Sequence, residues 1–500
     1  MSIPRLVESW VEEALDEFTA QRVPCDKIIR DTCHGIISLS PIEVTILDSP
    51  ILQRLRQIHQ MECAFFVYPG ARHSRFEHSL GALATVTQYC DALQDVKGGK
   101  ANDDLRLALR LAGLLHDVGH GPFSHLSESI YEKIAAVQSE LKQTPFRPGK
   151  NERRKRNSAS EMFAYYIVTS SSLKDFVYDN FSKFNYDGPS PDLDEIATFI
   201  IGKPKDPLVN QFKADMINGP FDADKLDYLV RDAHYTGLPL AIDADLITRA
   251  ARIHQGRLAF EYKAVHLLEQ LVFAKLQMFS TVYHQQKNRA AHCTMKSILE
   301  LLHDNPRDSG FVTLRKATDF LRWNDLDILN LDRVAKNAVK RAVTSFRERK
   351  IMKRALVVSY STLVPDDASR ASLVSLAEQA NEDQVDVIHS LRRAIVESAF
   401  SEPDDYMASV WADFPKPPTL DEPAGALLMS RGVFAGTLEP LLPDGLEEKY
   451  VASKWKGHIF GPADVELRNK IAKAAKSVLE SEYPDLKLSE SSWKEAGTVV

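Results

Sequence analysis

The segment A-G-L-L-H-D-V-G-H-G-P-F-S-H places His116 next to Asp117 at the end of an amphipathic helix that we expect over residues 103–117. A buried imidazole and a buried carboxylate cost several kcal/mol unless partners satisfy them, and a divalent metal ion would satisfy both. The glycines and the proline that follow predict a tight turn carrying His120 and His125. The segment therefore predicts two metal ligands beside two further imidazoles.

Two other segments supply the ligands that this pair lacks. V-Y-P-G-A-R-H-S-R-F-E-H-S-L-G contains Arg75 and His78, and F-D-A-D-K-L-D-Y-L-V-R-D contains Asp224, Lys225 and Tyr228. Imidazole favours Zn, Fe, Ni or Cu and carboxylate admits Mg and Mn, so the sequence does not distinguish among Mg, Mn, Fe, Co, Ni and Zn. Four protein ligands leave coordination positions for water and a phosphate oxygen.

Phosphoester cleavage is the reaction class that these residue types favour. It places negative charge on oxygens around phosphorus, which positioned cations stabilise. A metal ion, Lys225, Arg75 and a protonated His120 or His125 would supply positive charge. Histidine suits the proton transfer because its unperturbed pKa is about 6.5.

The ordered series of motifs from about residue 27 to about residue 292 resembles the HD-domain superfamily, specifically its deoxynucleoside triphosphate triphosphohydrolase branch. The motifs include H-G at 34–35, Q-R-L-R-Q-I-H-Q-M, P-G-A-R-H-S-R-F-E-H-S-L-G, H-D-V-G-H-G-P-F-S-H and D-A-D-K-L-D-Y-L-V-R-D. The resemblance implies a mainly α fold with a helical HD core and a smaller mixed α/β C-terminal portion. We expect an N-terminal helical segment at 1–26, the catalytic core at 27–350 and a regulatory or oligomerisation portion at 351–500.

The resemblance also implies a role for individual residues. The metal ligands would be His78, His116, Asp117 and Asp224. His120 would contact the phosphate nearest the sugar, and His125, supported by Glu128, would assist hydrolysis there. The sugar and phosphates would be held by Gln60, Arg75, Lys225, Tyr228 and Asp232. The implied reaction is metal-dependent hydrolysis of a deoxynucleoside triphosphate to a deoxynucleoside and inorganic triphosphate.

Two positions depart from the family pattern. Relatives often carry a His-Glu pair where this chain has Ser160 and Glu161, so one proton-handling imidazole is missing. In the family's activator site, the positions that grip a regulatory nucleotide match Lys27, Asp48, Gln53 and Arg56, whereas Arg30 and Ile36 replace other side chains. The sequence predicts nucleotide activation without indicating the base.

Three functions stay open at this stage. The first is the triphosphohydrolase. The second is an HD-type phosphohydrolase or phosphodiesterase acting on another nucleotide or on single-stranded nucleic acid, which the missing histidine and the basic stretch Phe146 to Asn157 favour. The third is a non-catalytic nucleotide sensor, suggested by Ser160. The basic stretch itself is either a solvated loop or an anion-binding lid.

Composition narrows the class of protein. A net charge of -7 over 500 residues argues against a general nucleic-acid coat. The five cysteines are odd in number and lack C-x-x-C spacing, which indicates neither a disulfide framework nor a zinc knuckle. The acidic amphipathic start does not read as a secretory signal, and no apolar run approaches the roughly 20 residues of a membrane span. We expect a cytoplasmic homo-oligomer, a tetramer or hexamer by resemblance.

Hydrophobic periodicity predicts helices at 4–20, 50–60, 77–95, 103–117, 124–141, 158–170, 192–202, 223–233, 243–252, 264–303, 329–349 and 368–399. A strand is predicted at 355–361, an extended linker at 415–423, and a strand and turn near 455–462.

Several residues have a structural reading beside a functional one. We expect His59, His73 and His234 to be hydrogen-bonded core residues and Arg231 to be an ion-pair partner. Asp222 is a helix N-cap candidate. Glu77 and Asp227 stay open between structural and functional parts. The tract 271–289 reads as core, with His284, Lys287 and Arg289 as either its continuation or a phosphate-facing end.

Overall fold

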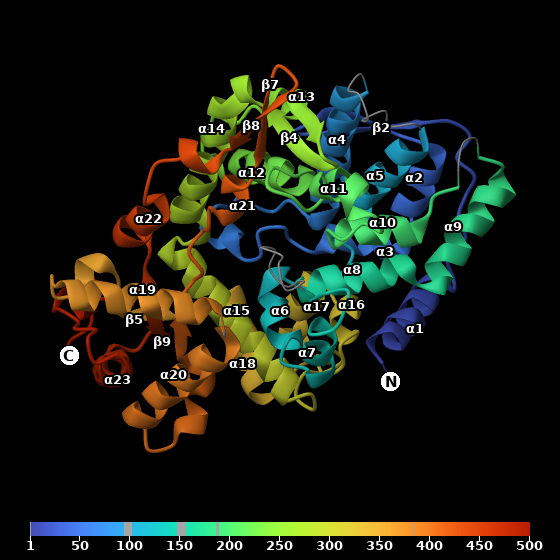
Figure 1. Cartoon of the computed structure of the whole chain (residues 1–500). Helices are drawn as coiled ribbons and strands as arrows, with labels where there is room; N and C mark the ends of the chain where they lie inside the picture. The colour runs from blue at the N-terminus through green and yellow to red at the C-terminus, as the bar shows by residue number, and fades with distance from the viewer. Residues whose placement is uncertain (1, 95–102, 148–156, 187–189, 383) are drawn as a thin grey trace.

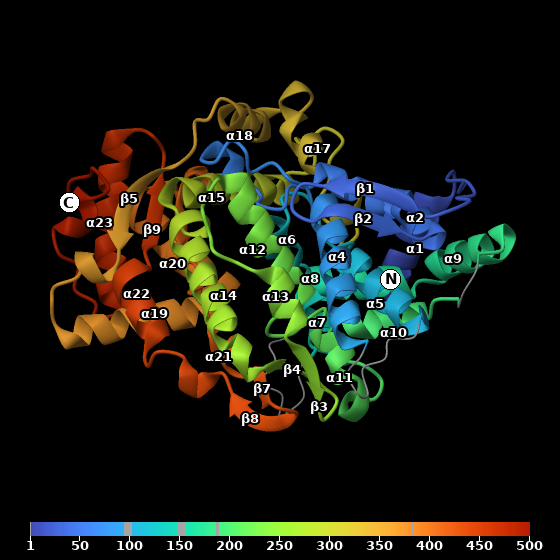
Figure 2. The ribbon, with the colours of Figure 1, turned by 90° about the horizontal axis from the view of Figure 1, so that it is seen from above.

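The structure is a computed structural model that describes residues 2–94, 103–147, 157–186, 190–382 and 384–500. Within these residues the fold is mainly helical with three small sheets, which confirms the predicted class. In Figures 1 and 2, the segments that come early in the chain gather on one side and most segments after residue 351 on the other. One buried apolar cluster reaches from Ile3 to Leu488 and joins the two sides.

Three helices form the centre that positions the site. α4 (Arg75–Leu93) packs against both α5 (Asp103–Leu115) and α12 (Ala223–Thr236), and α10 (Leu193–Ile200) packs against α5 and α8 (Ala159–Thr169). The leucines of α5 that recur on one face are buried, as its period predicts. The functional side chains therefore project from a packed, rigid set of helices.

Local caps decide where two of these helices begin. Ser74 accepts a hydrogen bond from the Glu77 backbone N–H, and the Glu77 carboxylate accepts from the Ser74 backbone N–H, which forms a capping box at the start of α4. The carboxylate of Asp222 caps α12 by accepting from the backbone N–H of Lys225 at 2.7 Å. The prediction that Asp222 is the N-cap of α12 is confirmed, and Glu77 has a structural role in capping α4.

The other helices before residue 350 surround this centre. They are α1 (Ile3–Leu15), α2 (Pro41–Leu47), α3 (Pro50–Gln53), α6 (His125–Tyr131), α7 (Ala135–Leu141), α9 (Ser171–Phe184), α11 (Pro207–Asp215), α13 (Ala244–Arg249), α14 (Val265–Met278), α15 (Gln286–Asp304), α16 (Asp319–Arg322), α17 (Asp325–Leu329) and α18 (Asn337–Arg347). The helix expected at 124–141 is divided into α6 and α7. The helix expected at 264–303 is interrupted by a π-helical turn, Phe279–Tyr283.

The sheets are small. β1 (Lys27–Asp31) and β2 (Gly35–Leu39) form an antiparallel hairpin that the helix-period analysis missed. β3 (Ala251–His254) and β4 (Arg257–Glu261) continue through β7 (Leu427–Ser430) to β8 (Val433–Thr437). β7 belongs to the C-terminal portion and pairs in parallel with β4, which belongs to the part before residue 350. The C-terminal portion therefore returns to the helical core.

The third sheet confirms both strands predicted in the C-terminal portion. β5 (Lys353–Val358) and β6 (Trp411–Asp413) flank β9 (Gly457–Gly461), and both pairs are antiparallel. Helices cover it and complete the portion: α19 (Asp367–Glu382), α20 (Gln384–Ala399), α21 (Asp421–Ala424), α22 (Leu446–Lys454), α23 (Val465–Glu482) and α24 (Ser491–Lys494). The helical run expected at 368–399 corresponds to α19 and α20, which flank residue 383, outside the described residues.

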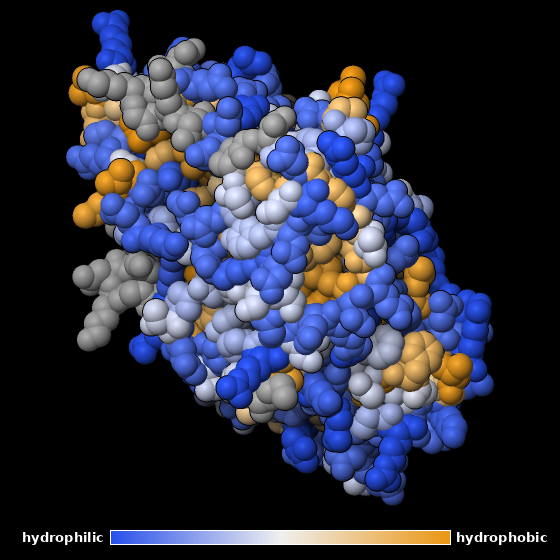
Figure 3. Space-filling model, turned by 90° about the vertical axis from the view of Figure 1, so that its right-hand side faces the viewer, coloured by the Kyte–Doolittle hydropathy of each residue, from blue (hydrophilic) through white to orange (hydrophobic). Residues whose placement is uncertain are grey.

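The surface is mainly polar. The face in Figure 3 is largely hydrophilic, with apolar side chains showing in small separate areas. Among the described residues, a search for a helix with the length and hydropathy of a membrane span finds none.

Candidate metal and catalytic site

The four side chains that the sequence nominated as metal ligands converge on one centre. His78 projects from α4, His116 and Asp117 follow the end of α5, and Asp224 lies in the first turn of α12. His78 Nε2 lies 3.2 Å from His116 Nε2 and 3.0 Å from Asp224 Oδ1, and Asp117 Oδ1 lies 3.4 Å from His116 Nε2. Segments separated by more than 100 residues of chain thus meet at one point.

The hydrogen bonds of the two histidines fix which nitrogen faces the centre. Nδ1 of His116 lies 2.8 Å from the carbonyl oxygen of Gly113, which can only accept, and Nδ1 of His78 lies 2.7 Å from a carboxylate oxygen of Asp227. Both Nδ1 atoms are therefore donors, and in the neutral rings both Nε2 lone pairs point at each other. Two lone pairs 3.2 Å apart repel unless a proton or a metal ion lies between them. The donor set fits a divalent metal ion.

Electrostatics agree with that fit. The carboxylates of Asp224 and Asp227 raise the pKa of His78 to about 10, against the effect of burial. The centre therefore attracts positive charge. His78 is fully buried, whereas the Asp224 side chain is 36% exposed, so the centre opens to solvent on one side.

Asp117 is held on two sides. Its Oδ2 accepts from Arg75 Nη1 at 2.7 Å, and its Oδ1 lies 3.3 Å from His120 Nε2. Burial would raise the pKa of Asp117, but the charge of Arg75, with the nearby imidazoles, holds it well below its usual range. Arg75 is itself buried. This predicted substrate contact is therefore also the buried ion-pair partner of Asp117, a predicted metal ligand.

Asp227, whose role the sequence left open, positions His78. It is fully buried and lies 2.7 Å from His78 Nδ1, 2.6 Å from His34 Nε2 and 2.9 Å from Arg231 Nε. Arg231 also pairs with Asp31, which confirms the ion-pair reading of this arginine. A Cβ on Gly81 would lie 1.9 Å from the Asp227 carboxylate, so only glycine lets α12 approach α4 here. Such a carboxylate fixes the orientation of a histidine ligand.

The second cluster predicted from the sequence lies beside the first. His125 Nδ1 lies 3.0 Å from Glu128 Oε2, and the rings of His120 and His125 are 4.8 Å apart in an edge-on arrangement. The His125 side chain is 59% exposed, whereas His120 is buried. Ser160, at the position that departs from the family pattern, donates to the other oxygen of Glu128.

The two imidazoles of this cluster differ in charge. Burial and the neighbouring Arg75 lower the pKa of His120 to about 4, which leaves it neutral near pH 7. Desolvation also acts on His125, but the Glu128 carboxylate outweighs it and raises the pKa of His125. Burial opposes ionisation of Glu128, yet His125 lowers its pKa to about 2. The pair is an imidazolium held by a carboxylate, which suits a general acid.

A strained turn presents His125. Phe123 and Ser124 both have positive φ, 54° and 52°, which is costly for residues with side chains. Asp325 holds the turn, because its Oδ1 accepts from the Phe123 backbone N–H at 2.6 Å and its Oδ2 lies 2.6 Å from His59 Nδ1. His59 is thus a hydrogen-bonded structural residue, as expected, and Asp325 is a supporting residue that the sequence did not reveal.

The face of α12 beyond the metal centre carries the predicted sugar contacts. Asp232 lies 2.7 Å from His73 Nε2 and accepts from the Tyr283 hydroxyl at 2.6 Å. His73 has the polar partner expected of it. Tyr283, expected in the core, is packed against it, and the π-helical turn that ends at this residue places its hydroxyl beside Asp232. His234, expected in the core, is exposed near the end of α12.

The remaining predicted substrate residues have mixed environments. The side-chain oxygen of Gln60 is buried and has no hydrogen-bond partner among the described residues. Tyr228 is partly buried, one turn of α12 after Asp224. Lys225 Nζ lies 2.7 Å from Asp222, 2.8 Å from the Gly219 carbonyl and 3.3 Å from Glu422, so its charge is shared among protein acceptors.

Comparison with known proteins identifies two matching family models. The HD domain model matches residues 75–164, and the HD associated region model matches residues 242–394. The chain thus contains a segment that matches the HD domain, followed by one that matches the HD associated region. The match to the HD domain includes the turn with His116 and Asp117 and both residues of the His125 and Glu128 pair, whereas Asp224 follows the matched range.

Relatives of this chain include triphosphohydrolases. It is 32% identical over 258 residues to the Mus musculus deoxynucleoside triphosphate triphosphohydrolase SAMHD1, which covers 48% of this chain and 36% of that protein. It is 28% identical over 345 residues to an uncharacterized protein of Methanocaldococcus jannaschii, covering 68% of this chain and 61% of that protein. The matches to these two relatives thus span less than two thirds of their length.

Solved structures share the fold. A phosphohydrolase from Bacteroides thetaiotaomicron superposes with a TM-score of 0.59 at 20% identity, covering 88% of this chain and 100% of that chain. A hypothetical protein from Aquifex aeolicus gives a TM-score of 0.60 at 20% identity, covering 90% of this chain and 100% of that chain. At this identity the likeness concerns the fold alone.

The four residues matched to an activator site also lie close together in this chain, at the surface. Lys27 Nζ lies 3.8 Å from Asp48 Oδ2, both side chains being 53% exposed. Gln53 donates to the Leu47 carbonyl at 2.8 Å and accepts from Arg56 at 2.7 Å. The structure therefore gathers the predicted set. The basic segment singled out at 146–157 falls mostly at 148–156, outside the described residues.

Proposed function

We propose that this protein is a metal-dependent deoxynucleoside triphosphate triphosphohydrolase. The observation that carries the proposal is the meeting of two imidazole Nε2 atoms 3.2 Å apart, with two carboxylates around them and the charged His125 and Glu128 pair at the open side. The similarity to triphosphohydrolases supports the substrate class.

In the proposed site, His78, His116, Asp117 and Asp224 hold the metal ion, and Asp227 orients His78. When bound, the metal supplies Lewis-acid polarisation of a phosphoryl oxygen and a lowered pKa for bound water. Arg75 adds a fixed positive charge beside the developing negative charge.

His125 would act as the general acid. Attack of a water oxygen on the phosphorus nearest the sugar forms one P–O bond and breaks the bond to the sugar oxygen. The protonated His125 gives its proton to that leaving oxygen. Of the two protons of the attacking water, one is released through solvent and restores the protonated His125, and the other stays on the new end of the triphosphate or dissociates from it. Glu128 holds His125 in the charged form, and Ser160 holds Glu128.

The sugar would lie on the face of α12 that carries Tyr228 and Asp232, with Gln60 opposite. The unpartnered side-chain oxygen of Gln60 supports this position, because a buried acceptor gains from a hydroxyl donor. We propose further that Lys27, Asp48, Gln53 and Arg56 bind an activating nucleotide, and that the enzyme is a cytoplasmic homo-oligomer, tetramer or hexamer. The five cysteines, all of them free, agree with a reducing compartment.

A panel of nucleotides incubated with the purified protein and Mg²⁺, Mn²⁺ or Co²⁺ tests the proposal. Free triphosphate with deoxynucleoside, resolved by anion exchange, would support it. Monophosphate products would instead favour phosphohydrolase or phosphodiesterase activity on another substrate. The contact of Ser160 with Glu128 is the specific observation that favours this second function. Tight binding without turnover would identify a nucleotide sensor.

A further inference from the structure

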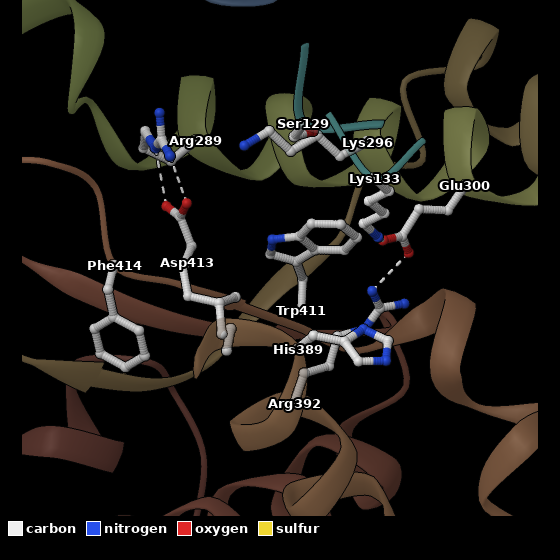
Figure 4. Close-up of a pocket in the computed structure, with 12 residues that line it drawn as sticks. Ser129, Lys133, Arg289, Lys296, Glu300, His389, Arg392, Trp411, Asp413 and Phe414 are labelled. Atoms are coloured by element: carbon white, nitrogen blue, oxygen red, sulfur yellow. Dashed lines mark hydrogen bonds and ion pairs between the residues drawn. The ribbon is translucent and has the colours of Figure 1, made fainter. Parts of the chain in front are cut away.

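A pocket beside the metal centre is lined by cations. It encloses about 570 Å³ of space, including its open mouth, between α6, α15, α20 and β6. Figure 4 shows its lining side chains around the indole of Trp411. The polar side chains in its wall are Ser129, Lys133, Arg289, Lys296, Glu300, His389, Arg392 and Asp413. We name it the cationic pocket.

Positive charge exceeds negative charge in the cationic pocket, because four lysines and arginines meet two carboxylates. Glu300 is shared between Lys133 at 2.5 Å and Arg392 at 2.6 Å. Asp413 accepts from Arg289 at 2.9 Å. Lys296 is half-buried, and in the described part of the chain it has no carboxylate within ion-pair distance. An anion in the pocket would complete the charge balance.

Two imidazoles behind the cationic pocket are held in the neutral form. His458 is buried, and burial together with cations including Arg289 lowers its pKa to about 3 against the effect of Asp413. Burial and Arg289 likewise lower the pKa of His284 to about 3. Both nitrogens of His458 lack a hydrogen-bond partner within the described residues. These rings stay neutral chiefly because they are buried, and the nearby cations add to that effect.

The wall of the pocket also offers apolar surface. The guanidinium of Arg392 lies 4.3 Å from the ring centroid of Trp411, and Phe414, Ile388 and Ala412 complete the lining. In Figure 4 the lysines approach the indole from one side and Arg392 from the other. Ammonium and guanidinium groups around an aromatic wall suit a phosphate group attached to a small organic body.

We propose that the cationic pocket is a second anion site, which binds a small phosphate-bearing molecule separately from the metal centre. The two sites are neighbours. α6 contributes His125 and Glu128 to the catalytic pair and Ser129 to the pocket, and the charge on Glu62 is influenced by both His125 and Lys296. A bound phosphate would therefore lie next to the helix that carries the general acid.

Calorimetric titration of the metal-loaded full chain with inorganic triphosphate tests this inference. The wild-type protein is expected to bind at two sites, the metal centre and the cationic pocket. Lys296→Gln should weaken the pocket site at least tenfold, Lys296→Arg should retain it, and Lys340→Gln, on the exposed side of α18, should leave both sites unchanged. Asp117→Asn should remove only the metal-centre site, so failure of the proposed function is distinguished from failure of this one.

Lys133→Gln provides a second variant on the opposite wall and should also weaken the pocket site. Titrations with inorganic phosphate and with a deoxynucleoside triphosphate distinguish a site for the phosphate alone from a site for a whole nucleotide. A single class of sites in the wild type that neither lysine variant changes would overturn the inference.

Discussion

The metal centre and the cationic pocket both have buried histidines beside charged side chains, yet the pKa values of these histidines shift in opposite directions. At the metal centre the pKa of the buried His78 is raised to about 10, whereas beside the pocket the pKa of the buried His458 is lowered to about 3. Burial alone disfavours the charged imidazole in both places. The difference comes from the neighbours: Asp224 and Asp227 outweigh burial at His78, whereas at His458 the single carboxylate of Asp413 does not outweigh burial and the nearby cations.

The comparison shows what decides the ligand of a buried histidine cluster. Carboxylates that face imidazole Nε2 atoms create a place for a cation, while arginines and lysines around neutral imidazoles create a place for an anion. Neutralising one charge in either region should therefore remove one class of ligand and leave the other.

The largest effect is expected from Asp117→Asn. The amide keeps the shape of the side chain but removes one negative ligand, so metal affinity and turnover should fall together, turnover by at least about 10³-fold. Elemental analysis after dialysis and product assays measure the two. Asp91→Asn, at an exposed ion pair on α4, serves as the control. An active, metal-loaded Asp117→Asn protein would place the cation elsewhere.

His125→Gln should keep the metal and slow turnover by about 10²- to 10⁴-fold, because it removes a proton donor without touching a ligand. The wild-type rate should fall as pH rises through the pKa of His125, which lies above the ordinary value, since only the imidazolium donates. The rate of the variant should not show this fall with rising pH. If the rate of His125→Gln still fell at alkaline pH as the wild-type rate does, the general acid would be another group. His266→Gln, at an exposed position, is the control for loss of a histidine.

A smaller effect is expected from Asp227→Asn. Weakening the acceptor of His78 Nδ1–H should lower metal affinity by about 10- to 100-fold, and turnover at saturating metal should fall less. Asp31→Asn is the matched control, because Asp31 pairs with the same Arg231 without touching a predicted ligand. Equal metal affinities in the two variants would show that the network acts through Arg231 alone.

His458→Gln addresses the opposite region and should affect stability only. The folded-state pKa of His458, about 3, lies below the usual 6.5, so the unfolded chain binds more protons as pH falls between these values. The contribution of His458 is present above about pH 6.5 and is lost by about 1.4 kcal/mol per pH unit below it. Urea unfolding at pH 7 and pH 5 should show a shallower acid dependence for the variant. The same dependence in both proteins would contradict a neutral His458.

The main helices and the four candidate metal ligands could be predicted from the sequence because their signals are local. The leucine period of α5 and the HD pair at its end identify both the helix and the metal-binding chemistry without knowledge of the fold. The same holds for β5 and β9, whose apolar runs end at turn residues.

The supporting residues could not be predicted, because their roles depend on distant partners. Asp325 holds the strained turn before His125 from about 200 positions away, and Tyr283 reaches Asp232 only because a π-helical turn rotates it out of the core pattern. The cationic pocket joins Arg289 on α15 to Asp413 at the end of a strand that is three residues long. No spacing within one segment carries that information.

Titration of the purified chain with Co²⁺, followed by visible absorption, tests the central claim most directly. We predict one tightly bound Co²⁺ per chain, with a spectrum typical of mixed nitrogen and oxygen ligation, and loss of that signal in His116→Gln. A wild-type chain that binds no Co²⁺ at one equivalent, or a spectrum that His116→Gln leaves unchanged, would contradict it.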